Sequence, residues 1–155
     1  MDTLTWMHKH KFIHEVQCVT ARNNKKSKFY PLTGKTGGII SPIRFKHTFY
    51  CKKVKEYLEN KAGNVELEYT PEETKFAQKR IDVALIENDT LTAYEISLSF
   101  DNLIDNIEKC NLMNAKKIII VCESKPDKIK AQNKVSKSKK FISQNIEFKL
   151  ISNFM

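Results

Sequence analysis

The sequence predicts an α/β fold, with a mixed sheet flanked by helices. Three observations lead to this prediction. Residues 44–60 carry apolar side chains at helical spacing, and the segments between 64 and 99 then alternate apolar and polar side chains as strands do. A second helical segment at 101–114 leads into the continuous apolar run at 117–122, which is typical of a strand buried on both faces. The order helix, three strands, helix, strand therefore predicts a meander followed by a crossover.

The bulk composition indicates a single domain with a short appended segment. The chain has 155 residues, and we place a basic extension at 1–42 and the core domain at 43–155. No apolar run approaches the ~20 residues of a membrane span, so we expect no membrane partner. The four cysteines are widely spaced, no apolar signal region opens the chain, and reduced thiols in a cytoplasmic protein are expected.

The predicted strands place their side chains alternately on the two faces of the sheet. They span 64–70, 80–87 and 92–99, with a turn at 87–89. One set of alternating residues is apolar: Val65, Leu67 and Tyr69, then Ile81, Val83 and Leu85, then Tyr94, Ile96 and Leu98. The other set includes Asp82, Glu95 and Ser97, which we expect to share a polar face turned away from the core.

The remaining elements complete the expected sandwich. The helix at 101–114 presents one apolar stripe, which is formed by Leu103, Ile104, Ile107 and Cys110. A Lys-rich helix at 126–140 and a final strand at 146–151 close the chain.

Two carboxylates, those of Asp82 and Glu95, are the leading candidates for chemistry. They lie on adjacent strands of a tight hairpin, so the two groups can meet. Close carboxylates repel each other unless a cation or a proton separates them. Mg²⁺ prefers such oxygen ligands and could activate a water against a phosphate. The alternative is an ordinary polar sheet face in contact with solvent, where acidic residues are common.

The stretch RIDVALIENDTLTAYEIS, residues 80–97, resembles the core of the PD-(D/E)XK nucleases. The resemblance implies a restriction-endonuclease-like αβββαβ core and metal-dependent hydrolysis of phosphodiester bonds in DNA. It also implies that Asp82 and Glu95 hold Mg²⁺ or Mn²⁺, with the carbonyl of Ile96 as a further ligand.

The family places a lysine two residues after its second acid, and this chain has Ser97 there. A serine cannot supply the missing positive charge. Some members of the family take the lysine from the following helix, and Lys109 is the candidate for that role. The predicted catalytic residues are therefore Asp82, Glu95, Ser97 and Lys109. The alternative for Lys109 is an ordinary surface lysine that points to water.

The chain also resembles the nuclease-like domain attached to DNA-translocating ATPases of conjugation and to other mobile-element proteins. The likeness rests on a His at the start of the first helix (His47), on DVAL (82–85), on EIS (95–97) and on the Asn106, Ile107, Lys109, Cys110 pattern. It implies a phosphate-contacting role for His47 and Asn106 and a partner within a larger DNA-processing assembly. The alternative for His47 is a core histidine bonded to the backbone.

Charge is distributed unevenly in this basic chain, which has a formal net charge of +9. Residues 8–35 and 124–140 are rich in lysine, whereas 56–109 are acidic, as expected for basic arms that hold DNA around a central metal site. The expected DNA-contacting lysines are Lys25, Lys26, Lys28, Lys128, Lys130 and Lys134. The basic stretch at 21–38 resembles the wing of a winged-helix domain. A solvated lysine-rich surface is the alternative.

Two functions follow from these patterns. The first is a metal-dependent endonuclease that acts on DNA. The second is a catalytically inactive module of the same fold that binds DNA or a protein partner, with a homodimer left open.

Overall fold

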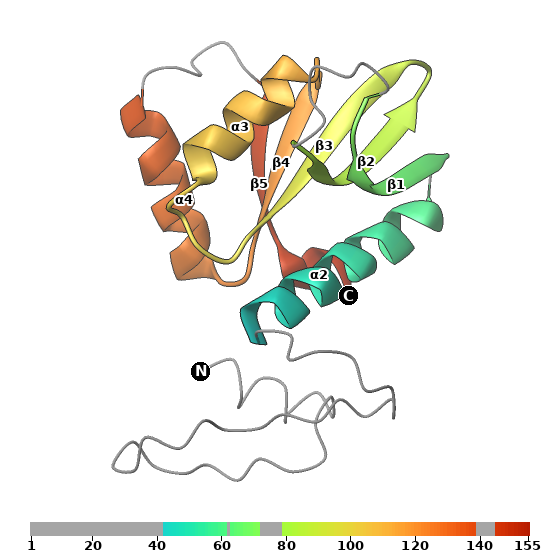
Figure 1. Ribbon diagram of the computed structural model, residues 1–155. Coiled ribbons are helices and arrows are strands. Elements are labelled where there is room, and N and C mark those ends of the chain that lie inside the picture. The colour runs from blue at the N-terminus through green and yellow to red at the C-terminus, as the bar shows by residue number, and fades with distance from the viewer. Residues whose placement is uncertain (1–41, 62, 72–78, 139–144) are drawn as a thin grey trace, which may run out of the picture. The chain divides into compact units, whose positions relative to one another are not determined.

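The computed structural model describes residues 42–61, 63–71, 79–138 and 145–155 (Figure 1). The predicted extension, with Lys25, Lys26 and Lys28, lies outside these residues apart from its last position. Contacts divide the chain into two units, Met1–Thr48 and Phe49–Met155, and the second contains the whole sheet. The described elements are α2 (Pro42–Glu59), β1 (Asn64–Tyr69), β2 (Ile81–Glu87), β3 (Thr90–Ser97), α3 (Leu103–Leu112), β4 (Lys117–Cys122), α4 (Lys125–Ser138), β5 (Ile146–Leu150) and the 3₁₀ helix η2 (Ile151–Phe154).

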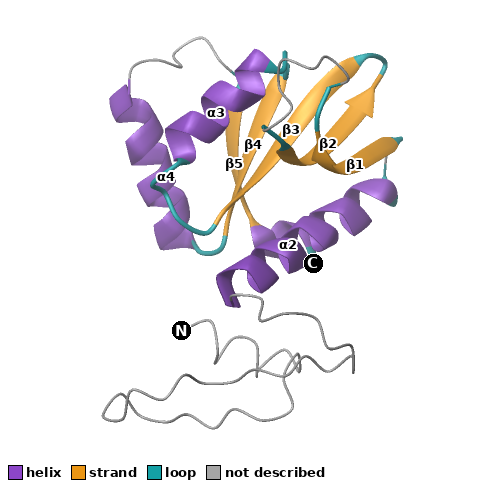
Figure 2. Cartoon of the chain, in the orientation of Figure 1, coloured by secondary structure: helices purple, strands orange, loops and turns teal. Residues whose placement is uncertain are grey.

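The sheet confirms the predicted α/β class. Its five strands are arranged in the order β1-β2-β3-β4-β5. The pairs β1–β2 and β2–β3 are antiparallel, and the pairs β3–β4 and β4–β5 are parallel, so the sheet is mixed. Helices α3 and α4 form the crossovers that parallel neighbours require (Figure 2). Among the described residues, no helix has the length and apolar character needed to cross a membrane.

Helices α3 and α4 cover the sheet face that carries Ala93 and Glu95. The buried cluster on this face joins Leu103 and Ile107 of α3 and Ala131 of α4 to the strand residues Ala84, Ala93, Ile118, Ile120 and Cys122. The expectation that Glu95 and Ser97 would turn away from the core is therefore wrong. Glu95 is 2% exposed and Ser97 is 7% exposed, because the crossover helices pack over the face on which both side chains lie.

An aromatic cluster anchors the opposite face. The ring of Phe154 in η2 meets Tyr57 of α2 edge-on at 5.2 Å and Tyr94 of β3 at 6.1 Å. Phe154 is buried, so the last turn of the chain ties α2 to the middle of the sheet. The predicted strand at 146–151 accordingly ends at Leu150, where the chain turns into η2.

The edge strand β1 departs from the predicted alternation. Val65 is buried as expected, but Leu67 is 37% exposed. Glu68 follows it with a φ of +49°, in the left-handed region that disfavours a regular strand. Among the described strands β1 is the edge of the sheet, and the backbone turn at Glu68 interrupts its regular geometry.

Candidate metal-binding and catalytic site

The pairing of β2 with β3 changes character at Asp82 and Glu95. Regular partners run from Glu87 and Thr90 to Val83 and Tyr94, and side chains take over the bonding at Asp82 and Glu95, which come next on each strand. There the amide of Ile96 donates to Oδ2 of Asp82 at 2.8 Å. The amide of Asp82 donates in turn to Oε1 of Glu95 at 3.4 Å. Both carboxylates are thus held between the two strands, each by a backbone amide of the facing strand.

Glu95 carries its carboxylate in a nearly dry environment. Burial is the main cause that raises its pKa from the ordinary 4.5 to about 7, and the nearby charge of Asp82 acts in the same direction. Lys109 opposes both effects. The site therefore concentrates negative charge that a positive partner would stabilise.

That positive partner is Lys109 of α3. Its Nζ lies 2.8 Å from Oε1 and 2.8 Å from Oε2 of Glu95, and its side chain is only 11% exposed. The alternative of a surface lysine in contact with water is wrong. Lys109 follows one side of the apolar stripe of α3, from which its long stem reaches across to the sheet.

Ser97 lies at the end of β3, but its hydroxyl does not bond to either acid. It donates to the carbonyl of Ser99 at 3.0 Å and so shapes the turn that leaves the strand. Of the predicted catalytic groups, Lys109 contacts Glu95, whereas Ser97 bonds to the backbone carbonyl of Ser99.

Two cysteines, Cys110 and Cys51, also lie at this site, although the sequence did not lead us to expect them there. The thiol of Cys110 donates to Oε1 of Glu95 at 3.5 Å. Cys51 of α2 has its Sγ within 4.8 Å of a carboxylate oxygen of Asp82. Burial and the charges of Asp82 and Glu95 raise the pKa of Cys51 well above its ordinary value. In the sequence, Cys110 could have been linked to the site because it follows Lys109. Cys51 could have been linked to it because it lies on the apolar face of its helix.

The oxygen-rich part of the site suits a hard divalent cation. The carboxylates of Asp82 and Glu95 each accept an amide of the facing strand, and the charge of Asp82 lies near enough to raise the pKa of Glu95. Mg²⁺ and Mn²⁺ prefer such carboxylate ligands and retain several waters. Asp82 and Glu95 offer the oxygen ligands that such a cation takes, and Ile96 follows Glu95 on β3.

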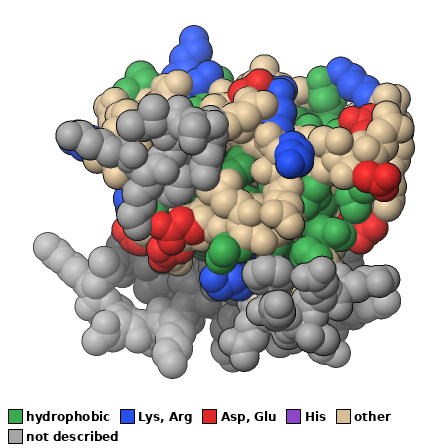
Figure 3. All heavy atoms as spheres, turned by 90° about the horizontal axis from the view of Figure 1, so that it is seen from above, with side chains coloured by type: hydrophobic (Ala, Val, Ile, Leu, Met, Phe, Trp, Pro, Cys, Tyr) green, Lys and Arg blue, Asp and Glu red, His purple; other side chains and the backbone are tan. Residues whose placement is uncertain are grey.

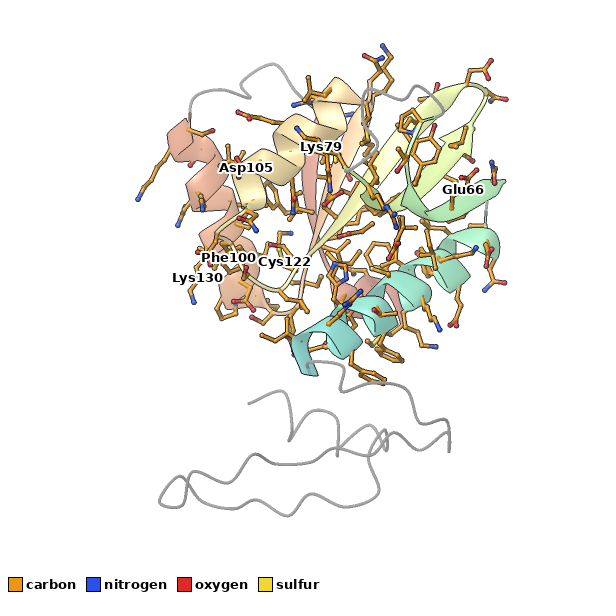
Figure 4. All side chains as sticks on the ribbon, viewed as in Figure 1. Glu66, Lys79, Phe100, Asp105, Cys122 and Lys130 are labelled. Atoms are coloured by element: carbon orange, nitrogen blue, oxygen red, sulfur yellow. The ribbon has the colours of Figure 1, made fainter. Side chains whose placement is uncertain are left out.

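The remaining predicted DNA-contacting residues lie on the helices. His47 is half-buried on α2, one turn before Cys51, and Asn106 is half-buried on α3, one turn before Lys109. Of the α4 lysines, Lys130 is exposed and points outward from the helix (Figure 4). Lys134 instead donates to the carbonyls of Phe100 and Asp101. Lys134 thus braces the loop before α3 rather than extending into solvent.

Charged side chains are interspersed on the face of the molecule shown in Figure 3. Basic, acidic and hydrophobic groups alternate over this view, without one continuous basic patch. The described side chains that this view shows therefore form no extended basic surface.

Comparison with known proteins yields no match: no family model, no curated protein and no solved structure is similar enough to assign the chain to a family.

Proposed function

We propose that the chain is a divalent-metal-dependent nuclease domain that hydrolyses phosphodiester bonds in DNA. The observation that carries the proposal is the convergence of Asp82, Glu95 and Lys109. Glu95 accepts both the ammonium of Lys109 from the following helix and the amide of Asp82 from the adjacent strand, although burying the Glu95 carboxylate costs solvation energy. A buried charged group contributes little to stability, and buried groups with shifted pKa values are concentrated at catalytic sites.

The element order α2, β1, β2, β3, α3, β4 supports a restriction-endonuclease-like core. In that core the first acid precedes a hairpin turn and the second follows it, as Asp82 and Glu95 do here. The parallel strand β4 is added beside β3 through α3, so the helix that supplies Lys109 packs over the acid-bearing strand.

Each residue has a distinct task in this proposal. Asp82 and Glu95 would hold Mg²⁺ or Mn²⁺, which supplies an activated water and neutralises charge on a phosphate oxygen. Lys109 takes the place of the lysine that Ser97 cannot provide and stabilises negative charge that develops on the phosphate or the attacking water. His47, Asn106 and the exposed lysines of α4 position the DNA backbone.

The test is cleavage of supercoiled plasmid DNA in the presence of Mn²⁺. We expect the wild-type chain to nick the plasmid and Glu95→Gln to be at least about 100-fold slower, since loss of a metal ligand costs more than loss of an outer-sphere contact. The matched control is Glu87→Gln, an exposed acid at the end of β2, which should cut at the wild-type rate. Plasmid nicking by Glu95→Gln at the wild-type rate would contradict the proposal.

A second candidate function is a binding module that does not cut. The observation in its favour is that Lys109 already contacts both oxygens of Glu95, as in a purely structural ion pair. This module would retard DNA in a salt-dependent manner with no nicking in Mn²⁺ or Mg²⁺. Absence of retardation at low salt would instead favour a protein partner in a larger DNA-processing assembly, or a second copy of the chain.

A further inference from the structure

The ammonium group of Lys109 lies on the side of the Glu95 carboxylate that a cation bound by both oxygens would use. Its Nζ is equidistant, at 2.8 Å, from Oε1 and Oε2. A divalent ion that used both oxygens would occupy the same side of the carboxylate at a shorter distance, about 2.1 Å for Mg²⁺. Lysine and ion therefore exclude each other from this position.

The other contacts of Glu95 leave little freedom for the ion to bind elsewhere. Oε1 also accepts the thiol of Cys110 at 3.5 Å and the amide of Asp82 at 3.4 Å. The thiol belongs to a fully buried residue of α3, and the amide belongs to the backbone of β2, so neither can withdraw without disturbing the core. Lys109 is the one donor on a long, partly exposed stem, and it is the donor that can leave.

We propose that Lys109 is an exchangeable counterion: it neutralises Glu95 in the metal-free protein and gives up the carboxylate to a divalent cation. In this role Lys109 stabilises the buried acid before the ion arrives. Because the ion and the lysine compete, the metal-free protein binds cations more weakly than its two carboxylates alone would. The inference rests on the proposed function only in its choice of cation, and within that function the displaced ammonium becomes available to a phosphate.

Cation binding to Lys109 variants tests the exchange without any cleavage assay. Free Mn²⁺ is measured by electron paramagnetic resonance as it is titrated into each protein in the absence of DNA. We expect Lys109→Met to bind Mn²⁺ about tenfold more tightly than wild type or better, because a charged hydrogen bond no longer competes. Lys109→Arg should bind no more tightly than wild type, since a guanidinium also holds both oxygens.

Two controls separate exchange from a general change in charge. Lys116→Met removes one positive charge from an exposed position before β4, and it should leave Mn²⁺ affinity unchanged. Glu95→Gln should lose the binding altogether, which identifies the site. Unchanged or weaker Mn²⁺ binding by Lys109→Met would overturn the proposal, and so would an equal gain in Lys116→Met.

A second measurement uses the wild-type protein and so does not depend on a variant that folds. An amine-reactive reagent, with digestion and mass spectrometry, reports the modification rate of each lysine. Lys109 should react slowly without a divalent ion and several-fold faster with saturating Mg²⁺, while the rate for Lys116 stays constant. A rate for Lys109 that Mg²⁺ leaves unchanged would contradict the exchange.

The outcomes distinguish this inference from the nuclease proposal. Tighter Mn²⁺ binding by Lys109→Met together with a wild-type protein that never cuts would remove the nuclease and keep the exchange. Glu95-dependent cutting together with no gain in Mn²⁺ affinity would keep the nuclease and remove the exchange.

Discussion

Asp82 and Glu95 each accept a backbone amide from the strand that carries the other. The two acids are therefore part of the hydrogen bonding that joins β2 to β3, and backbone amides fix their carboxylates. A site fixed in this way needs little rearrangement of its ligands, which favours tight geometry around an ion. The same bonds keep the negative charges of Asp82 and Glu95 near each other in the folded protein. This repulsion should have measurable effects on the free energy of unfolding.

Stability should fall as pH rises through the titration of Glu95. Its pKa is about 7 in the folded protein against an ordinary 4.5, so between these values the folded state holds a proton that the unfolded state has lost. The free energy of unfolding then decreases with increasing pH, by up to about 3 kcal/mol over this window. Glu95→Gln cannot titrate and should lack this component. Urea unfolding of both proteins at several pH values checks it, and parallel profiles would contradict it.

Removal of Lys109 should destabilise the fold unless Glu95 is neutralised as well. Lys109→Met leaves a buried carboxylate without its cation, at an expected cost of about 3 kcal/mol near pH 8. In the double variant with Glu95→Gln most of that loss should be recovered, because no buried charge remains. A double-mutant cycle by chemical denaturation measures the coupling. Additive losses in the double variant would mean that the ion pair contributes nothing to stability.

Ser97 should be dispensable for cutting although it lies two residues after Glu95 on β3. Its hydroxyl bonds only to the carbonyl of Ser99 among the contacts that the structure gives it, so Ser97→Ala should cost about 1 kcal/mol of stability. The rate of plasmid nicking should remain within about twofold of wild type, a change too small for a lost transition-state contact. A loss of nicking as large as that of Glu95→Gln would give Ser97 a direct part in the chemistry.

The α4 lysines should divide into DNA contacts and structural contacts. Lys130→Ala should weaken the binding of every DNA sequence to a similar extent. The slope of log affinity against log salt concentration should become shallower by about one, as expected for a lost phosphate contact. Lys134→Ala should instead lower the melting temperature, because its ammonium bonds to the carbonyls of Phe100 and Asp101. Retardation assays at several salt concentrations and thermal unfolding distinguish the two. A shallower salt slope for Lys134→Ala alone would reverse the assignment.

The C-terminal aromatic should be essential for a stable fold. Phe154 is 4% exposed between Tyr57 and Tyr94, and Phe154→Ala should cost about 3–5 kcal/mol. Ser152→Ala, at an exposed position of the same turn, is the matched control and should change little. Equal denaturation midpoints for the two variants would show that η2 does not hold α2 to the sheet.

Sequence periodicity predicted the α/β class and the elements that carry Asp82 and Glu95, but it could not predict their burial. Alternation shows that Glu95 and Ser97 share a face with Ala93, yet it does not show that a helix more than five residues later will cover that face. The direction of Lys109 was equally open. It lies beside Cys110 at the margin of the apolar stripe of α3, where a long side chain can turn inward or outward. Only the buried acid across from it decides the direction.

The bond from the amide of Ile96 to Asp82 has a consequence for how this fold would change over generations. An acceptor at position 82 serves the fold whether or not the protein cuts DNA, because β3 would otherwise lack a partner for that amide. An aspartate there is then a poor marker of enzymatic activity. Glu95 and Lys109, which neutralise each other, are expected to disappear together, so their joint retention is the more informative trait.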